Sequence, residues 1–216
     1  AHMIGFRVIY IGYICVYSLS LAGTQRVGSA LGANRPAAAK RSCCVGAVFA
    51  AFCALALGIV ITTHREIFAG IFTHDPDLIE VCKSLAPKIA VAQFFMTLAD
   101  YFNPMLNTQG RPNASLTSSF VASWLGHVPI CYILVFRVYR DEAPIQRINW
   151  LWVGICIGYF AQCSLAFLFV LCSDWPGLAR SARRVSEVRE GISEGELGMS
   201  LQENSCSAQQ AESVSA

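Results

Sequence analysis

The stretch AVFAAFCALALGIVI, residues 47–61, decides the fold of this chain. It carries no charge, and apolar side chains cover every face that a helix would present. A strand of a membrane barrel would instead alternate lipid-facing and lumen-facing residues over about ten positions. Together with its apolar flanks the run approaches the roughly 20 residues that a membrane-spanning helix needs. We therefore predict a helix inside a lipid bilayer.

The composition of the whole chain agrees with a membrane protein. Of its 216 residues, 55% are hydrophobic and 14% are charged, and the mean hydropathy is +0.48. Soluble domains average about 25% charged residues, and a soluble core of this size could not bury so much apolar surface. The net charge is only +2, and no basic block interleaves with aromatic residues. Nucleic acid is therefore not an expected partner, whereas membrane lipid is.

Sequence motifs of soluble enzymes are missing. The chain has no GxGxxG, no GxxxxGK[ST] and no HExxH motif, so we predict neither an enzyme nor a nucleotide-driven pump. Its ten cysteines include no CxxC pair, and most of them lie in apolar runs, where they are expected to behave as small hydrophobic residues. No cofactor is expected.

The same length criterion predicts five membrane-spanning helices, over residues 4–22, 43–62, 86–106, 115–136 and 150–172. Turn-forming residues separate them. The fold class is therefore an all-α membrane bundle over residues 1–175. Residues 176–216 are rich in Ser, Glu, Gln and Arg and are predicted to form a disordered tail. Within this tail, residues 179–188 are also compatible with an amphipathic segment on an anionic membrane surface.

The distribution of Lys and Arg predicts the orientation in the membrane. One side would hold nine basic residues, in the 23–42 loop, the 107–114 turn and the tail, and the other side would hold six. These residues are Arg26, Arg35, Lys40, Arg41, Arg111, Arg180, Arg183, Arg184 and Arg189 on the first side, and Arg65, Lys83, Lys88, Arg137, Arg140 and Arg147 on the second. Because positive residues favour the cytoplasm, the C-terminus is expected there, in a plasma or vacuolar-type membrane.

The predicted helix over residues 86–106 carries a carboxylate, Asp100, near its middle. A charge inside the hydrocarbon region costs several kcal/mol, so it usually has a function. Other polar residues lie on the same helical face. With Asp100 they form a stripe made of Gln93, Thr97, Asn103, Pro104 and Asn107. Lipid offers such a stripe no partner, so we expect it to face protein or a water-filled cavity.

Pro104 adds a second oxygen beside the Asp100 carboxylate. Proline has no N–H group, so the backbone carbonyl of residue 100 loses its helical hydrogen bond. The two oxygens, with Asn103 nearby, could hold a sodium ion or organise a proton site. The alternative is a carboxylate paired with an Arg or Lys of a neighbouring helix. Gln162, in the last predicted span, is interpreted either as a contact between helices or as cavity lining.

Three segments indicate a family. Residues 25–41, QRVGSALGANRPAAAKR, resemble the RVGxALGAxxxxxAKR signature of the multidrug and toxic compound extrusion (MATE) family, with Arg26, Gly28 and Gly32 at its motif positions. Residues 71–79, IFTHDPDLI, resemble the family's IFTxDxxI segment. The turn over residues 107–112, NTQGRP, is similar to the family's glycine-containing turn between two helices.

The resemblance implies a twelve-helix fold of two six-helix lobes that exchanges Na⁺ or H⁺ for organic, often cationic, compounds. The similarity corresponds to the C-terminal lobe from its second helix onward, so an N-terminal lobe would be a missing partner. Many members have a glutamate where this chain has Met96, and Asp100 lies one turn further along the same face. Members also often have an acidic residue near the position of Arg7.

We therefore expect a fragment of a secondary active antiporter that exports small organic cations. Asp100 would couple transport to the ion, and Gln93, Thr97, Asn103 and Gln162 would line the substrate cavity. The alternative is a membrane scaffold or an inactive truncated transporter that transports nothing, in which the polar stripe would serve assembly.

Overall fold

The structure is a computed structural model that describes residues 2–188, and these residues form helices joined by short turns, with no strand among them. The elements in chain order are α1 (His2–Gly32), α2 (Pro36–Thr63), α3 (Arg65–Phe72), α4 (Pro76–Thr108), α5 (Pro112–Phe120), η1 (Val121–His127), α6 (Val128–Tyr132), η2 (Ile133–Val138) and α7 (Pro144–Leu171). The elements η1 and η2 are π-helical stretches of one continuous rod with α5 and α6. A further helix covers residues 175–188.

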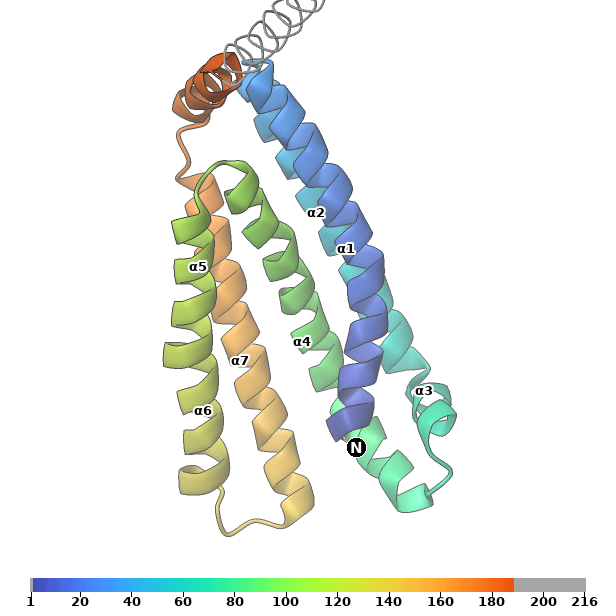
Figure 1. The fold of residues 1–216 in the computed structure, drawn as a ribbon. Coiled ribbons are helices and arrows are strands. Elements are labelled where there is room, and N and C mark those ends of the chain that lie inside the picture. Colours follow the sequence, from blue (N-terminus) through green and yellow to red (C-terminus); the bar gives the residue numbers. More distant parts are fainter. Residues whose placement is uncertain (1, 189–216) are drawn as a thin grey trace, which may run out of the picture.

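The long helices run up and down side by side, and α4 is at their centre (Figure 1). It packs against α1 and α2 on one side and against α7 on the other, while the α5–η2 rod packs on α7. The turns α1–α2 and α4–α5 and the helix over residues 175–188 share one end of the bundle, and α3 lies at the opposite end (Figure 1).

Three helical segments are long and apolar enough to cross a membrane: Pro36–Thr63, Pro112–Val138 and Pro144–Leu171. They contain three of the five predicted spans. The helices α1 and α4 have 31 and 33 residues, which exceeds the length that a span needs; among the described residues, α4 does not meet the same apolar criterion. The helical fold class is therefore confirmed, and five spans stay a prediction.

The family-motif segment is helical, so its assignment to a loop after residue 22 was wrong. The helix α1 continues through Arg26 and Gly28 to Gly32. Val27 and Leu31 lie one turn apart and are 0% and 2% exposed. Burial of two aliphatic side chains is worth about 1.5–3 kcal/mol each, which exceeds the roughly 1 kcal/mol that glycine costs in a helix. The prediction from helix-breaking residues such as glycine therefore put the end of α1 too early in the sequence.

The helices α1 and α4 end in the same way. Asn34 (φ 53°) and Gly110 (φ 70°) adopt left-handed backbone conformations. In both turns the next residue is an arginine whose N–H reaches back five residues, from Arg35 to the Ala30 carbonyl and from Arg111 to the Leu106 carbonyl, each at 2.9 Å. This hydrogen bond is the mark of a Schellman end. A proline then begins the following helix in both places, because its missing N–H costs nothing there.

The prediction of disorder from residue 176 onward was wrong for residues 176–188. Residues 175–188 form a helix, in which Trp175 and Ala179 are 6% and 0% exposed and belong to the same core cluster as Val27 and Met105. The composition suggested disorder, but a few buried apolar residues at helical spacing anchor this segment to the bundle end. The rest of the predicted tail, residues 189–216, lies outside the described residues.

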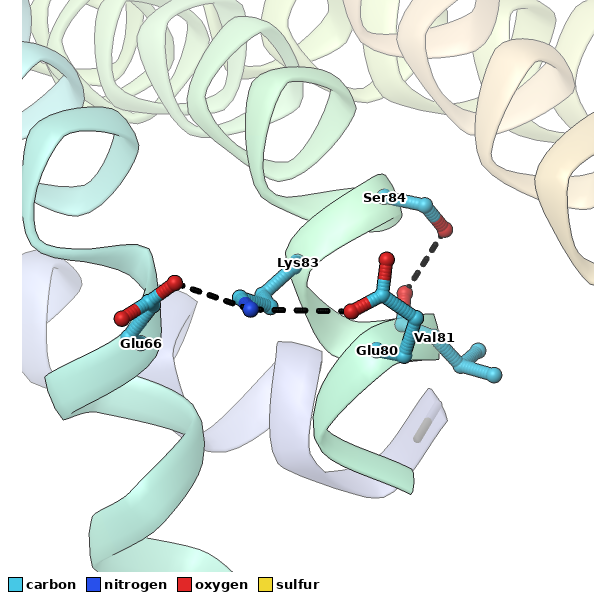
Figure 2. A network of polar contacts seen from close by, with 5 residues as sticks. All are labelled: Glu66, Glu80, Val81, Lys83 and Ser84. Atoms are coloured by element: carbon cyan, nitrogen blue, oxygen red, sulfur yellow. Dashed lines mark hydrogen bonds and ion pairs between the residues drawn. The ribbon is translucent and has the colours of Figure 1, made fainter. Parts of the chain in front are cut away.

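The short helix α3 was not expected from the sequence. Lys83 of α4 forms ion pairs with Glu66 of α3 at 2.8 Å and with Glu80 at 3.5 Å, and Figure 2 shows the lysine between the two carboxylates. The hydrogen bond from Lys83 lowers the pKa of the Glu66 carboxyl and raises the pKa of the Lys83 ammonium. This contact, outside the predicted spans, attaches α3 to α4.

The core at the other end of α4 is built around Tyr101. Its ring is fully buried, and its hydroxyl donates a hydrogen bond to the Cys43 carbonyl of α2 at 3.0 Å. The ring has room because α1 and α2 each have a glycine at the point where they face it. A Cβ at Gly46 would overlap the Tyr101 hydroxyl, and one at Gly23 would lie 2.8 Å from Met105. The glycines therefore set the distance at which α1 and α2 pack on α4.

Replacing Gly46 with alanine is expected to destabilise the bundle by about 1–3 kcal/mol, because the Tyr101 ring must shift and its hydrogen bond to α2 is lost. The measurement is the thermal unfolding midpoint of the detergent-solubilised chain, followed by circular dichroism. Gly126→Ala is the matched control, since a Cβ there meets nothing within 4 Å. An unchanged midpoint for Gly46→Ala would contradict the proposed role of this glycine.

Glu66 is expected to titrate below the ordinary glutamate pKa of about 4.3. Its pKa is lowered in the folded chain, so the contact stabilises α3 above that ordinary value and is lost as the pH falls through the lowered pKa. The measurement is ¹³C NMR titration of the glutamate carboxyls, with Glu66 assigned through Glu66→Gln.

Lys83→Met should return the Glu66 midpoint to the ordinary range, whereas Lys88→Met, a lysine of the same helix that bonds Asn149, should leave it low. Equal midpoints in the two variants would show that Lys83 does not lower the Glu66 pKa.

Candidate functional site: a polar stripe on helix α4

The predicted stripe exists as one face of α4, but its residues meet different neighbours. Gln93 and Thr97 are 0% and 2% exposed, Asp100 and Asn103 are half-buried, and Asn107 is exposed. The stripe therefore turns inward over its middle and reaches solvent at the α4–α5 turn. This burial follows from the central place of α4 in the bundle, because α1, α2 and α7 surround it.

Asp100 lies where α4 contacts α1. The Ser20 hydroxyl of α1 donates a hydrogen bond to the backbone carbonyl of Asp100 at 3.3 Å. This is the carbonyl that Pro104 deprives of its helical partner. Ser20 is 2% exposed, so a buried donor replaces the missing one. The freed carbonyl is consequently a contact between helices as well as an oxygen beside the carboxylate.

The Asp100 carboxylate keeps one oxygen without a partner. Its Oδ2 atom is buried and accepts no hydrogen bond from the described residues, and no ion pair of Asp100 is found among them. Within that part of the chain, the alternative of a salt bridge to a neighbouring helix is therefore not observed. Arg7 is exposed. Tyr13 of α1 and Tyr159 of α7 lie within electrostatic range of the carboxylate.

Gln93 and Thr97 continue the stripe away from the α4–α5 turn. The Gln93 amide Nε2 donates to the Thr97 hydroxyl at 3.0 Å. The Gln93 carbonyl Oε1 is buried and has no hydrogen-bond partner among the described residues. Because most buried polar atoms in proteins are paired, two unsatisfied acceptors seven residues apart on one helix, at Gln93 and Asp100, set this face apart.

The other two predicted lining residues meet α5. The Ser118 hydroxyl donates to Asn103 Oδ1 at 2.7 Å, and the Gln162 amide of α7 donates to the Ser119 hydroxyl at 3.4 Å. Two consecutive serines of α5 thus bond to α4 and α7, with Ser118 as a donor and Ser119 as an acceptor. The structure brings Asn103 and Gln162 to one three-helix junction, where both act as contacts between helices. Their role as cavity lining stays a prediction.

A pocket of about 730 Å³ lies between α2 and α4, but its walls are apolar and include no residue of the stripe. Phe94, Phe95 and Leu55 are among its lining residues. The stripe therefore does not open into this pocket in the present conformation.

No group of three or more His, Cys, Asp and Glu side chains that could hold a metal ion occurs in residues 2–188 as described. Asp100 would have to hold a sodium ion with hydroxyl, amide or carbonyl oxygens as the other ligands. Hard cations prefer oxygen ligands of these kinds, and the Gln93 and Asp100 acceptors are of that chemical type. A single proton needs only the carboxylate.

The family-motif residues lie at the end of α1. Arg26 is exposed, Gly28 faces Thr108 at the end of α4, and a Cβ at Gly32 would meet nothing within 4 Å. Gly28 therefore permits close packing of α1 on α4. At Gly32 no neighbouring atom would prevent a larger residue.

The turn over residues 107–112, the third segment that resembles the family, bonds to the end of α7. Arg111 donates to the Phe169 carbonyl at 3.1 Å and to the Ser173 hydroxyl at 2.8 Å, and that hydroxyl lies 2.8 Å from Gln109 Oε1. A guanidinium with several donors suits the unpaired carbonyls of a helix end. The turn thus links the end of α4 to the end of α7 and to Ser173 just beyond it.

Sequence reasoning missed Ser20 as the partner of the Asp100 carbonyl. A serine hydroxyl in a largely apolar run by itself indicates nothing. The Pro104 argument predicted a freed carbonyl at residue 100 but no donor for it, because the helix that supplies the donor depends on tertiary packing.

A bundle of long apolar helices with a carboxylate on a buried polar face has the features of an integral membrane protein. The MatE family model matches residues 1–133. The chain belongs to the MatE family. The resemblance of its three sequence segments to this family is thereby confirmed.

Relatives at full length are considerably longer than this chain. It is 26% identical over 192 residues to mouse multidrug and toxin extrusion protein 2, and 29% identical over 188 residues to multidrug and toxin extrusion protein 1 of Xenopus tropicalis. These alignments cover 89% and 87% of this chain but 32% of each relative, so the chain spans about a third of their length. The relatives' names describe extrusion proteins, in agreement with the prediction of a transporter segment and not an enzyme.

The fold is likewise that of part of a larger protein. The crystal structure of the eukaryotic MATE transporter AtDTX14 superposes with a TM-score of 0.77 at 24% identity, covering 84% of this chain and 39% of that one. This likeness supports the fold of a MATE fragment.

Replacing Ser20 with alanine is expected to destabilise the bundle by about 1 kcal/mol, because the buried carbonyl of Asp100 loses its donor. Thermal unfolding in detergent measures the change. Ser18→Ala is the matched control, since the exposed Ser18 hydroxyl contacts only the Ile14 carbonyl of its own helix. An equal loss of stability in Ser20→Ala and Ser18→Ala would mean that the hydrogen bond between α1 and α4 does not stabilise the bundle.

Proposed function

We propose that this chain is part of a secondary active transporter that exchanges Na⁺ or H⁺ for small organic cations, with Asp100 as the ion-coupling carboxylate. Gln93, Thr97, Asn103 and Gln162 line the path in the conformation that opens it. The family and its extrusion proteins support this class of function, and the geometry of α4 supports the assignment of the residues.

One observation carries the proposal: the stripe has more buried acceptors than donors. The Asp100 Oδ2 and Gln93 Oε1 atoms lack a donor among the described residues, and the Thr97 hydroxyl already accepts from Gln93. An unsatisfied buried acceptor costs about 1–3 kcal/mol, and more when it is charged. A cation or a proton removes this cost, so the stripe gains most from binding one.

The proposal includes an arrangement in the membrane. The five long helical rods, α1, α2, α4, α5–η2 and α7, each cross the bilayer, and they correspond to the C-terminal lobe of a twelve-helix transporter. The end that carries Arg26, Arg41 and Arg111 lies in the cytoplasm, as the count of basic residues favours. The membrane is a plasma or vacuolar-type membrane.

An N-terminal lobe completes the transport path. Since this chain corresponds to about a third of the relatives' length, the remaining helices would form the opposite wall of the cavity. The half-buried carboxylate of Asp100 would face that cavity in one conformation and α1 in the other.

Asp100→Asn is expected to abolish coupled transport, because the amide neither carries the charge that binds a cation nor exchanges a proton. The assay follows a fluorescent organic cation in liposomes that contain this chain together with the sequence that precedes it in its gene. A pH gradient alone and a sodium gradient alone are applied in separate experiments, so that the active gradient identifies the coupling ion.

Asp77→Asn is the matched control, an exposed carboxylate at the start of the same helix, and its transport should equal that of the wild type. Transport by Asp100→Asn at the wild-type rate would refute the assignment. Absence of gradient-driven transport in every variant, with Asp100→Asn changing the oligomeric state, would favour the scaffold alternative.

A further inference from the structure

The first two helices carry positive charge that nothing nearby neutralises. Residues 1–65 contain no Asp or Glu, and the first acidic residue of the chain is Glu66. Five basic residues lie in α1, α2 and the turn between them: Arg7, Arg26, Arg35, Lys40 and Arg41. None of them forms an ion pair with a residue in the described range 2–188. This surface is therefore positively charged, and an anionic partner would complement it.

A groove of about 350 Å³ between α1 and α2 leads to two of these residues. Its walls are apolar: Leu19 and Ala22 on α1, and Val45 and Phe49 on α2. Val45 and Phe49 are 64% and 54% exposed, which is unusual for side chains of this size unless they face lipid or a partner. Arg26 and Arg41 line the groove at the end that lies toward the α1–α2 turn.

The groove follows from the packing of Tyr101. Gly23 and Gly46 form part of its lining with their backbones, and both approach the Tyr101 ring on the opposite side. Glycine at these positions lets the Tyr101 ring pack behind α1 and α2, because an added Cβ at either position would meet the Tyr101 ring. The groove extends from Arg26 to Leu19, which is about 10 Å along a helix.

Such a groove suits a molecule with a charged head and an apolar chain. Two guanidinium groups recognise a phosphate well, because their planar donors bind its oxygens in pairs. Free phosphate would leave the apolar walls uncovered, and an apolar helix would leave the two arginines unpaired. A phospholipid satisfies both parts, and a net negative headgroup complements a surface that lacks any carboxylate.

We propose that the groove between α1 and α2 binds an anionic phospholipid, with its phosphate on Arg26 and Arg41 and an acyl chain along Leu19, Ala22, Val45 and Phe49. The site requires only that the chain is embedded in a membrane and does not rest on the transport function. The lipid would occupy the outside of the α1–α2 pair, across α1 and α2 from Tyr101.

The test is binding of phosphatidylglycerol to the full chain in detergent, measured by native mass spectrometry, with phosphatidylcholine as the zwitterionic comparison. Arg26→Gln/Arg41→Gln should bind phosphatidylglycerol roughly 30-fold more weakly, since each basic residue near a membrane surface contributes about 1 kcal/mol. The double variant Arg180→Gln/Arg184→Gln removes two exposed charges outside the groove and should change the affinity by less than about 3-fold.

A second variant tests the apolar part without changing the charge. Ala22→Trp fills the groove and should also weaken phosphatidylglycerol binding, while inorganic phosphate at millimolar concentration should not displace the lipid from the wild type. Circular dichroism verifies that each variant is folded.

Unchanged binding in Arg26→Gln/Arg41→Gln would overturn the proposal, as would equal losses in both double variants, which indicate general surface attraction. Displacement of the lipid by inorganic phosphate would also overturn it, because the site would then recognise only an anion and not the acyl chain. Because transport does not enter these measurements, their failure leaves the proposed function of Asp100 standing.

Discussion

The structure depends on the pairing of polar groups on α4 with groups on other helices, because lipid supplies no hydrogen-bond partner. The Asp100 carbonyl is paired with Ser20, the Tyr101 hydroxyl with the Cys43 carbonyl, and Asn103 with Ser118. These partners come from α1, α2 and α5. One helix that is more polar than its neighbours therefore holds the bundle in register, and the apolar helices around it supply single donors and acceptors at the required depth.

Against this background the unpaired oxygens of Gln93 and Asp100 stand out. A bundle that satisfies the other polar groups of the same helix so well could have satisfied these as well, had stability been the only requirement. Gln93 Oε1 and Asp100 Oδ2 are acceptors on one face of one helix, whereas Gln109 Nε2 and Arg147 Nε, also buried without a partner among the described residues, are donors elsewhere in the chain. Two unpaired acceptors on one face suit a ligand that supplies positive charge or a proton. That contrast supports an ion at the stripe more strongly than the presence of a carboxylate alone.

Much of the helical architecture could be predicted from the sequence, because apolar runs such as residues 47–61 leave a chain few alternatives. The ends of helices were less predictable. Glycines at 28 and 32 suggested a loop, yet burial of Val27 and Leu31 continues the helix. The stripe was predictable from spacing, but its partners were not, because Ser20 is 80 residues from Asp100 and only the fold brings them together.

The helix α1 connects the two sites of the molecule. Its Ser20 contacts the Asp100 carbonyl, while Leu19 and Ala22, adjacent in sequence, line the groove on its other side. Packing between α1 and α4 is tight at Gly23 and Gly28, where an added Cβ would lie within 3.4 Å of α4 side chains. Close packing at these two glycines ties the position of α1 to that of α4. The proposed lipid groove and the proposed ion-binding stripe therefore share one helix.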